Sequence, residues 1–285
     1  MDAKTVQTKT ARGKAPTKVP TTARAKVPTK APAKAPAKAP TKAPAKLSRP
    51  SKLQLDDLVL ANKILFRFNI VDAFGHISVR DERDPKNRYL MSRHIPPGMV
   101  TARDIVTFDM DSNPLTHVDM PQMSERYIHG EIYKLRPNVV SVVHCHARPL
   151  IPFGTAKGAK LRPMTHMCGF LGCGVPIYEI RDAGGMTDML VRTAPLGQAL
   201  AEVLGDKSVV LMRGHGATMV GTSIEEAVFR AIFATENATI QMQAHALAID
   251  GEVEFLSDEE STKSSRGRNV PRAWTLWKHQ ITAGG

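Results

Sequence analysis

Residues 138–147, NVVSVVHCHA, decide the fold. Their four valines favour an extended strand, because β-branched side chains pack well on a pleated surface. Side chains two positions apart in a strand point to the same face, so His144 and His146 lie side by side while Cys145 faces the other way. Two adjacent imidazoles suit a divalent metal ion held about 2.0–2.1 Å from each nitrogen. The alternative is a pair of partly buried histidines that are satisfied by hydrogen bonds.

A second histidine motif follows about seventy residues later. In MRGHGATMVG, residues 212–221, His215 lies between Gly214 and Gly216, directly after the apolar run SVVLM. Flanking glycines let the backbone bend sharply and approach a ligand closely. The motif predicts a strand, a turn and a second strand over 208–221, with His215 as a third metal ligand. The alternative is a turn histidine that is exposed to water.

An acidic residue lies upstream of the histidine pair. The segment SERYIHGEIYKLRP, residues 124–137, predicts a helix opened by Ser124 as N-cap and closed by Pro137. Glu125 then lies near the helix N-terminus, where the helix dipole favours a carboxylate. It is either a metal ligand or acid–base group, or only a favourable charge at a helix end. His129, one turn further on the same face, makes a rival metal pair with Glu125.

The remaining elements alternate along the chain. Apolar positions at helical spacing begin at Leu53, and the apolar face of that helix includes Phe66. The spacing of Ser223 and Glu226 is typical of a capping box at the start of a long helix. Interleaved helices and strands predict an α/β or α+β three-layer sandwich with a mixed sheet. The predicted helices are 53–68, 187–206 with Thr187 as a cap, and 223–249, and the predicted strands are 75–80, 88–93 and 104–111.

The formal charge of +12 belongs to the first fifty residues. Residues 1–50 carry 13 lysines and arginines and one acidic residue, and the rest of the chain is formally neutral. A repeated Lys-Ala-Pro unit without apolar periodicity predicts a disordered tail with polyproline-II character. Such a tail is a solvated extension, a transit peptide, or a nonspecific contact for polyanions, which it binds through counterion release.

No apolar run approaches the roughly 20 residues of a membrane-spanning helix, and no hydrophobic segment follows a charged start as in a secretory signal. We therefore expect a soluble, cytoplasmic protein without a membrane partner. The cysteines Cys145, Cys168 and Cys173 are odd in number and lack CxxC spacing, which predicts reduced thiols and neither a disulfide framework nor a zinc knuckle.

Taken together, SERYIHGEIYKLRPNVVSVVHCHARPLIPFG and the later VVLMRGHGATMVG resemble the class II aldolase and adducin-head family over roughly residues 53–255. The resemblance implies a catalytic domain over 51–285, folded as a three-layer α/β/α sandwich around a mixed, largely antiparallel sheet. It also implies a metal site of His144, His146 and His215, with Glu125 as a further ligand or acid–base group. The metal is normally Zn²⁺, and Mn²⁺, Fe²⁺, Co²⁺ and Mg²⁺ are alternatives.

Further motifs resemble the decarboxylase branch of that family: LMSRHIPPGMVT, FLGCGVPIYEIRD, TDMLVR and AWTLWK. The resemblance implies a carbon–carbon lyase that decarboxylates a 3,4-dihydroxyphthalate-type acid or a 2-hydroxy-3-carboxymuconate semialdehyde-type acid. His76 stands where phosphate-binding members have Asn, which disfavours a phosphosugar. The alternatives are a class II aldolase or dehydratase acting on a phosphorylated or carboxylated hydroxy-ketone, and a non-catalytic adducin-like binding protein.

Five residues are candidates for holding the small-molecule carboxylate substrate. An arginine presents a planar fork that matches a carboxylate, although strand-end arginines are often only solvated charges. The resemblance also implies a homotetramer. The segment 270–285, with both tryptophans, follows a polar link, SDEESTKSSRGRN, and either docks on its own domain or closes a neighbour's pocket. The substrate-binding candidates are His76, Arg80, Ser92, Arg93 and His166.

Overall fold

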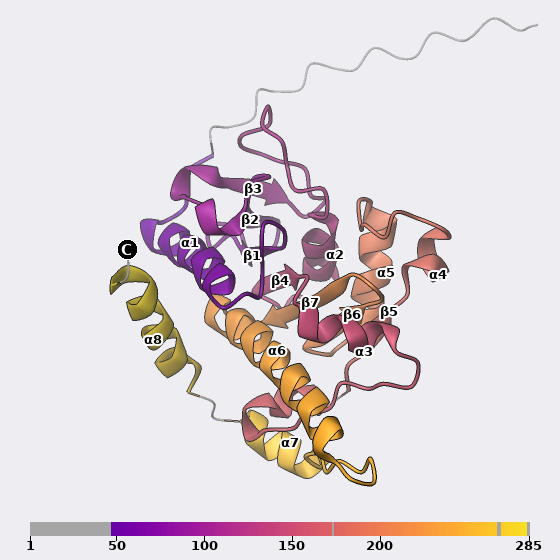
Figure 1. Ribbon diagram of the computed structural model, residues 1–285. Coiled ribbons are helices and arrows are strands. Elements are labelled where there is room, and N and C mark those ends of the chain that lie inside the picture. Colours follow the sequence, from indigo (N-terminus) through magenta and orange to yellow (C-terminus); the bar gives the residue numbers. More distant parts are fainter. Residues whose placement is uncertain (1–46, 173, 267–268, 284–285) are drawn as a thin grey trace, which may run out of the picture. The chain divides into compact units, whose positions relative to one another are not determined.

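A computed structural model describes residues 47–172, 174–266 and 269–283, and residues 48–285 belong to one compact unit. In this described part seven strands form one sheet in the order β3-β2-β1-β4-β7-β6-β5 (Figure 1). Neighbouring strands are antiparallel except β5 and β6, which are parallel. This confirms the predicted mixed, largely antiparallel sheet. The strands are β1 His76–Arg80, β2 Arg88–Ser92, β3 Ile105–Asp109, β4 Ser141–Cys145, β5 Ile177–Tyr178, β6 Val209–Met212 and β7 Gly216–Gly221.

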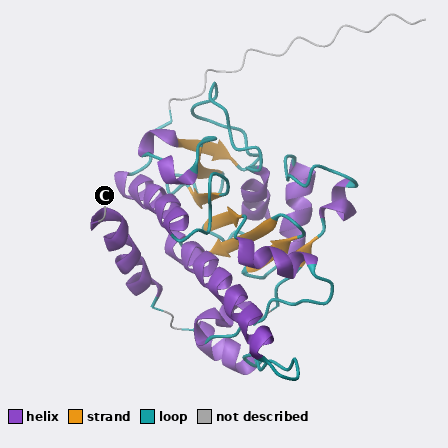
Figure 2. Cartoon of the chain, in the orientation of Figure 1, coloured by secondary structure: helices purple, strands orange, loops and turns teal. Residues whose placement is uncertain are grey.

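Helices cover both faces of the sheet, as Figure 2 shows, so the three-layer α/β/α prediction is confirmed. One apolar core lies between the sheet and helices α1, α6 and α8. A second core lies between the sheet and helices α2 and α5. The α-helices are α1 Lys52–Arg67, α2 Tyr127–Leu135, α3 Ile151–Thr155, α4 Ile180–Gly184, α5 Ala194–Leu204, α6 Ile224–Leu247, α7 Asp258–Ser265 and α8 Val270–Ala283, and the 3₁₀ helices are Pro97–Met99, Ala102–Asp104, Arg148–Leu150 and His166–Leu171.

Strand β4 directs alternate side chains into the two cores. Val142 belongs to the core beneath α2 and α5, whereas Val143 and Cys145 belong to the core beneath α1 and α6. By this alternation His144 faces the α2 side of the sheet. Cys145 is a fully buried thiol, and burial raises its pKa to about 11. Cys168 is also buried, and Cys173 lies outside the described residues.

The first helix begins where the composition of the chain changes. Ser51 caps α1 by accepting a hydrogen bond from the Gln54 N–H at 3.2 Å. Leu58 and Leu65 are buried as predicted, but Phe66 is 50% exposed. The face of α1 that packs against the sheet, α6 and α8 runs through Leu58, Ile64 and Leu65, so Phe66 lies at its edge. Residues 1–46, the greater part of the predicted disordered tail, lie outside the described residues.

Two predicted helix starts were wrong. The helix expected from Thr187 begins at Ala194, because Pro195 fits only the first turn of a helix, and Thr187 instead accepts a hydrogen bond from the Met189 N–H. The helix expected from Ser124 begins at Tyr127, after a turn over 124–126. Residues 187–193 and Glu125 therefore lie outside the helices, where their groups are available to a site.

The long helix α6 begins as predicted, with the Ser223 hydroxyl accepting from the Glu226 N–H at 3.1 Å. The capping box is not reciprocal, because the Glu226 carboxylate binds Thr222 and Arg230. None of the helices in the described residues is both long and apolar enough to span a membrane.

The segment expected to be a polar link is partly helical. Ser257 and Glu260 form a reciprocal capping box that starts α7, a signal that its polar composition concealed. Beyond it, α8 packs on its own domain, with the Trp277 ring 5.6 Å from that of Phe68. Trp274 and Trp277 are both buried in this way, which is the first of the two placements left open by the sequence.

Arg80 is a buried structural residue. Its Nε donates to the Val139 carbonyl at 2.6 Å, and its two terminal nitrogens donate to the carbonyls of Pro85 and Tyr133. Arg80→Met keeps the apolar stem but leaves these carbonyls without their donors. We expect the free energy of unfolding to fall by about 2–4 kcal/mol, measured by urea denaturation.

The control for this prediction is Arg88→Met. Arg88 is partly exposed and pairs at 3.4 Å with Asp84 in the turn before β2, so we expect a loss of less than about 1 kcal/mol. A stable Arg80→Met protein with a raised KM for a carboxylate substrate would return Arg80 to the substrate site.

Candidate metal centre

Two adjacent strands bring three histidines together. β4 and β7 are antiparallel, with Cys145 opposite Ala217, so His146 at the end of β4 lies beside His215 at the start of β7. Gly214 has a φ of +64°, and a Cβ at Gly216 would overlap the Cys145 carbonyl. Glycine on each side of His215 is therefore required by the turn and by the close approach of the two strands.

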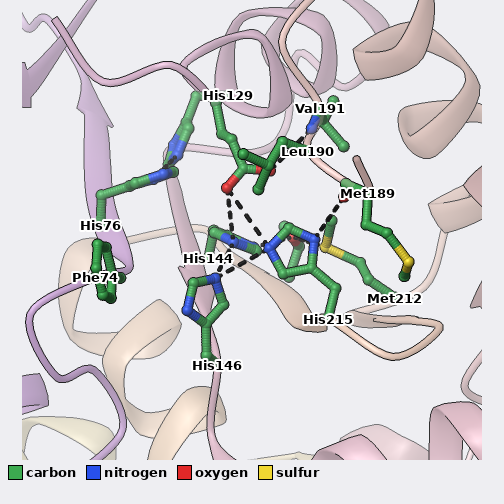
Figure 3. Close-up of polar contacts among 12 residues, drawn as sticks. Phe74, His76, His129, His144, His146, Met189, Leu190, Val191, Met212 and His215 are labelled. Atoms are coloured by element: carbon green, nitrogen blue, oxygen red, sulfur yellow. Dashed lines mark hydrogen bonds and ion pairs between the residues drawn. The ribbon is translucent and has the colours of Figure 1, made fainter. Parts of the chain in front are cut away.

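The reactive nitrogens converge on one point. The Nε2 atom of His146 lies 3.2 Å from Nε2 of His144 and 3.0 Å from Nε2 of His215. The Oε2 atom of Glu125 lies 3.6 Å from Nε2 of both His144 and His215. The four ligand atoms all lie within 4.8 Å of one another. Figure 3 shows the three imidazoles turned toward one another.

The opposite ring nitrogens are held by the protein. Nδ1 of His215 lies 3.0 Å from the Met189 carbonyl oxygen, which only accepts, so Nδ1 carries the proton and Nε2 presents its lone pair. Nδ1 of His144 lies 3.4 Å from the Thr218 hydroxyl. Partners of this kind fix the tautomer and orientation of metal-binding histidines.

The Glu125 side chain is buried and anchored. Its Oε1 accepts a hydrogen bond from the Val191 N–H at 2.9 Å, which leaves Oε2 directed at the histidines. Burial alone would raise the pKa of this carboxyl, but its polar contacts with His215, His144 and the Val191 N–H hold the pKa well below its usual range. Glu125 is thus an ionised carboxylate that can accept a proton.

Burial favours the neutral form of His144 and His146. It lowers the pKa of His144 well below the usual value and also lowers the pKa of His146. A neutral imidazole offers a lone pair, whereas an imidazolium repels a cation. Three imidazoles and one carboxylate suit a borderline divalent ion.

The rival pairing of Glu125 with His129 is not formed. His129 is fully buried, and its two ring nitrogens lie 2.6 Å from Nδ1 of His76 and 2.6 Å from the Ser78 hydroxyl. Both ring nitrogens of His129 are thus hydrogen-bonded to groups other than Glu125.

The proposed substrate-binding residues divide into two groups. His76 lines the cavity at the cluster, with its ring centroid 5.1 Å from that of His144. Arg80 is at the other end of β1, with its donors taken by carbonyl groups. Met91 lies opposite Ser78 and so shares the sheet face of His76. Ser92, the next residue in β2, is therefore buried on the other face of the sheet. Arg93 is bound to Asp104 at 2.8 Å, and His166 is exposed. The structure does not bring these last four residues into the cluster.

A cavity of about 570 Å³ opens onto the cluster. His76, Glu125 and His146 line it on the side of the cluster. No sequence motif indicated the rest of the wall or the loop at Met189 and Val191, whose main-chain groups hold His215 and Glu125. The other lining residues are Ala73, Phe74, Gly75, His94, Ile95, Pro96, Met123, Ser124 and Leu190.

Comparison with known proteins gives a consistent set of relatives. Residues 56–242 match the family described as the Class II Aldolase and Adducin N-terminal domain. The chain is 37% identical to decarboxylase tropJ of Talaromyces stipitatus, over 84% of this chain and 98% of that protein. It is 27% identical to a 3,4-dihydroxyphthalate decarboxylase of Arthrobacter keyseri, over 79% and 91% of the two chains. Its fold resembles that of an aldolase II superfamily protein from Pseudomonas syringae, with a TM-score of 0.68 at 23% identity, covering 84% and 96% of the two chains.

Proposed function

Because the chain belongs to the class II aldolase and adducin N-terminal domain family and is most similar to its decarboxylase branch, we propose that it is a divalent-metal-dependent carboxy-lyase. Its substrate is a hydroxylated aromatic dicarboxylate of the 3,4-dihydroxyphthalate type, or a 2-hydroxy-3-carboxymuconate semialdehyde-type acid. The observation that carries the proposal is the convergence of three imidazoles and one carboxylate beside a largely apolar cavity.

The residues fit a bound metal ion. A tetrahedral ion with ligand distances of about 2.0–2.1 Å has ligand atoms roughly 3.3 Å apart, and the Nε2 pairs measure 3.2 and 3.0 Å. His144, His146 and His215 would hold the ion, with Glu125 beside it, and we propose Zn²⁺, with Mn²⁺, Fe²⁺, Co²⁺ and Mg²⁺ as alternatives. When bound, the ion supplies Lewis-acid stabilisation of the negative charge that develops on substrate oxygens.

The cavity wall favours an aromatic acid over a phosphosugar. Phe74, Ile95, Pro96 and Leu190 give it an apolar lining on which a flat ring can pack. Among the described residues that line it, none is a lysine or an arginine. A phosphate dianion packed against this wall would therefore lack a positively charged partner. Substrate oxygens beside the four ligand atoms would instead lie next to the bound metal ion.

Glu125 is the proposed proton carrier. Its Oε2 would accept the proton of the substrate hydroxyl beside the carboxylate. The bond between that carboxylate and the adjacent carbon then breaks, carbon dioxide leaves, and the electron pair remains on the substrate. Glu125 returns the proton to this carbon, which balances the reaction.

The test combines metal analysis with a product assay. The purified full-length protein should contain about one zinc per chain, and 3,4-dihydroxyphthalate should be converted to carbon dioxide and 3,4-dihydroxybenzoate. Carbon dioxide release from neither acid class, together with cleavage of L-fuculose 1-phosphate, would replace the proposal by the aldolase alternative. A protein that binds no metal and turns over neither substrate would point to an adducin-like binding role.

Three further properties are proposals of the same kind: assembly as a homotetramer, a cytoplasmic location, and a catalytic domain that begins at residue 51 after a disordered tail. The tail accounts for the whole formal charge of +12. Because Ser51 caps α1, the domain retains its first helix cap without the tail.

Deleting residues 1–50 should leave zinc content and specific activity within about twofold of the full chain, since the deletion spares Ser51 and every residue of the cluster. The same deletion should abolish salt-sensitive retention on a heparin column. An inactive or unfolded truncated protein would show that the tail is structural.

A further inference from the structure

A buried hydrogen-bond chain extends from the cavity into the protein interior behind His76. Nδ1 of His76 lies 2.6 Å from Nε2 of His129, and Nδ1 of His129 lies 2.6 Å from the Ser78 hydroxyl. The Ser78 hydroxyl lies 2.7 Å from the Tyr133 hydroxyl. The four side chains are 0 to 4% exposed. Figure 3 shows His76 and His129 extending toward one another beside His144.

The chain is built by two regular elements. His76 and Ser78 are two positions apart on β1 and share a face, and His129 and Tyr133 are one turn apart on α2. Burial lowers the pKa of His129 to about 3 and raises the pKa of Tyr133 well above its usual range. His76 is 4% exposed, and its Nδ1 is hydrogen-bonded to an imidazole and not to a carboxylate. A chain of neutral members therefore has one proton on each imidazole.

Neutral members allow only two arrangements of protons. In the first, each group donates toward the cavity: Tyr133 to Ser78, Ser78 to His129, and His129 to His76. In the second, each group donates toward the interior, and Tyr133 donates to the Val140 carbonyl at 3.3 Å. The 2.7 Å contact between the Ser78 and Tyr133 hydroxyls is a hydrogen bond in both arrangements, so the terminal donor decides between them. In the second arrangement the buried Tyr133 O–H has an acceptor only at 3.3 Å, longer than a normal O–H···O bond, whereas in the first arrangement the terminal donor is the His76 N–H beside the cavity. This difference favours the first arrangement.

The first arrangement leaves His76 with its proton on Nε2. His76 lines the cavity, and no hydrogen bond among the described residues uses its Nε2 atom. We infer that His76 presents a neutral N–H to a negatively charged oxygen of the bound substrate, and that His129, Ser78 and Tyr133 are positioning residues that fix its tautomer. The inference rests on the proposed function for the identity of the substrate class.

The chain also limits what His76 does. If His76 gave its Nε2 proton away, the protons behind it would shift outward and leave a tyrosinate in the apolar core around Tyr133. His76 is thus a hydrogen-bond donor and not the source of the proton that goes to carbon. That task remains with Glu125.

The direct test is the tautomer of His76 in the zinc-loaded full-length protein. In protein labelled with ¹⁵N-histidine, with the His76 signals assigned by their absence in His76→Gln, Nε2 should be the protonated nitrogen and Nδ1 the unprotonated one. Addition of 3,4-dihydroxybenzoate as the carboxylate probe should shift the Nε2–H signal. A proton on Nδ1 in both the free and the bound protein would overturn the inference.

Two tyrosine variants distinguish a positioning role of the Tyr133 hydroxyl from a purely structural one. Tyr133→Phe keeps the ring and removes the terminal donor, so we expect a mixture of His76 tautomers and a kcat about 10-fold lower with unchanged zinc content and KM. The matched control is Tyr178→Phe, because the Tyr178 hydroxyl is bound to the Leu196 carbonyl at 3.1 Å within the same core but has no link to His76. Equal tautomer populations and equal kcat in both variants would contradict the inference.

Changes at His76 itself test the donor. His76→Leu should lower kcat/KM about 100-fold, as expected for the loss of a hydrogen bond to a charged group, and His76→Gln, which keeps an N–H, should recover about 10-fold of this loss. Normal kcat/KM in His76→Leu would sink the inference. If the wild-type protein releases no carbon dioxide, the proposed function fails, and the tautomer measurement still decides on the hydrogen-bond chain.

Discussion

Replacing His146 with alanine is expected to lower the affinity for zinc by at least about 100-fold and to remove nearly all turnover. The Nε2 atom of His146 is the one that lies within 3.2 Å of both of the other imidazole nitrogens, so its loss opens the centre of the ligand set. Changes to groups that only support a ligand already cost 10- to 100-fold. Zinc content after dialysis and the rate of carbon dioxide release measure the two effects.

His146 is the cleanest of the three histidines to remove. It follows β4 and is only partly buried, whereas His144 is fully buried and its truncation would also leave a cavity in the core. The thermal unfolding of metal-free His146→Ala should therefore match that of the metal-free wild type. His245→Ala, an exposed change on α6, is the histidine control. Normal zinc content in His146→Ala would remove this residue from the ligand set.

The sheet and the convergence of the histidines could be predicted because they depend on local signals. Strand periodicity predicts that His144 and His146 point to the same face, and the Gly-His-Gly turn places His215 at the start of the partner strand. The register of β4 and β7 then brings the two motifs together. A family resemblance supplied the link between these motifs and Glu125, which no local pattern contains.

The substrate-binding candidates show what the alternation of side chains along a strand cannot predict. His76 and Arg80 share a face of β1, as alternation predicts, but four residues of strand separate them by roughly 13 Å. Only His76 therefore reaches the cavity. The face of Ser92 depends on its register with β1, which no pattern within β2 reveals.

The loop 189–191 was concealed for a different reason. Its sequence continues smoothly into α5, so it resembled the first turns of a helix. Met189 instead has a φ of +72°, and its carbonyl holds His215 while Val191 holds Glu125. These are main-chain contacts, which the identity of a side chain does not encode.

Glu125→Gln is expected to separate metal binding from proton transfer. Glutamine has the shape of glutamate, and its carbonyl oxygen can still accept the Val191 N–H that anchors the side chain. Its amide nitrogen cannot accept a proton. The three histidines should continue to bind zinc, although less tightly than with the carboxylate beside them. We expect kcat to fall by about 10²- to 10⁴-fold, the usual contribution of a general acid–base group.

The comparison with His146→Ala makes the assignment of Glu125 testable. If Glu125 is mainly a proton carrier, Glu125→Gln loses turnover far more than zinc, whereas His146→Ala loses both together. Glu131→Gln is the matched control, because Glu131 is a buried glutamate on the adjacent helix α2 that pairs with Lys134 at 2.8 Å. If Glu125→Gln lost zinc as completely as His146→Ala, Glu125 would be primarily a metal ligand. Wild-type kcat in Glu125→Gln would leave the carboxylate with one role, as the acceptor that holds the loop at Val191 in place.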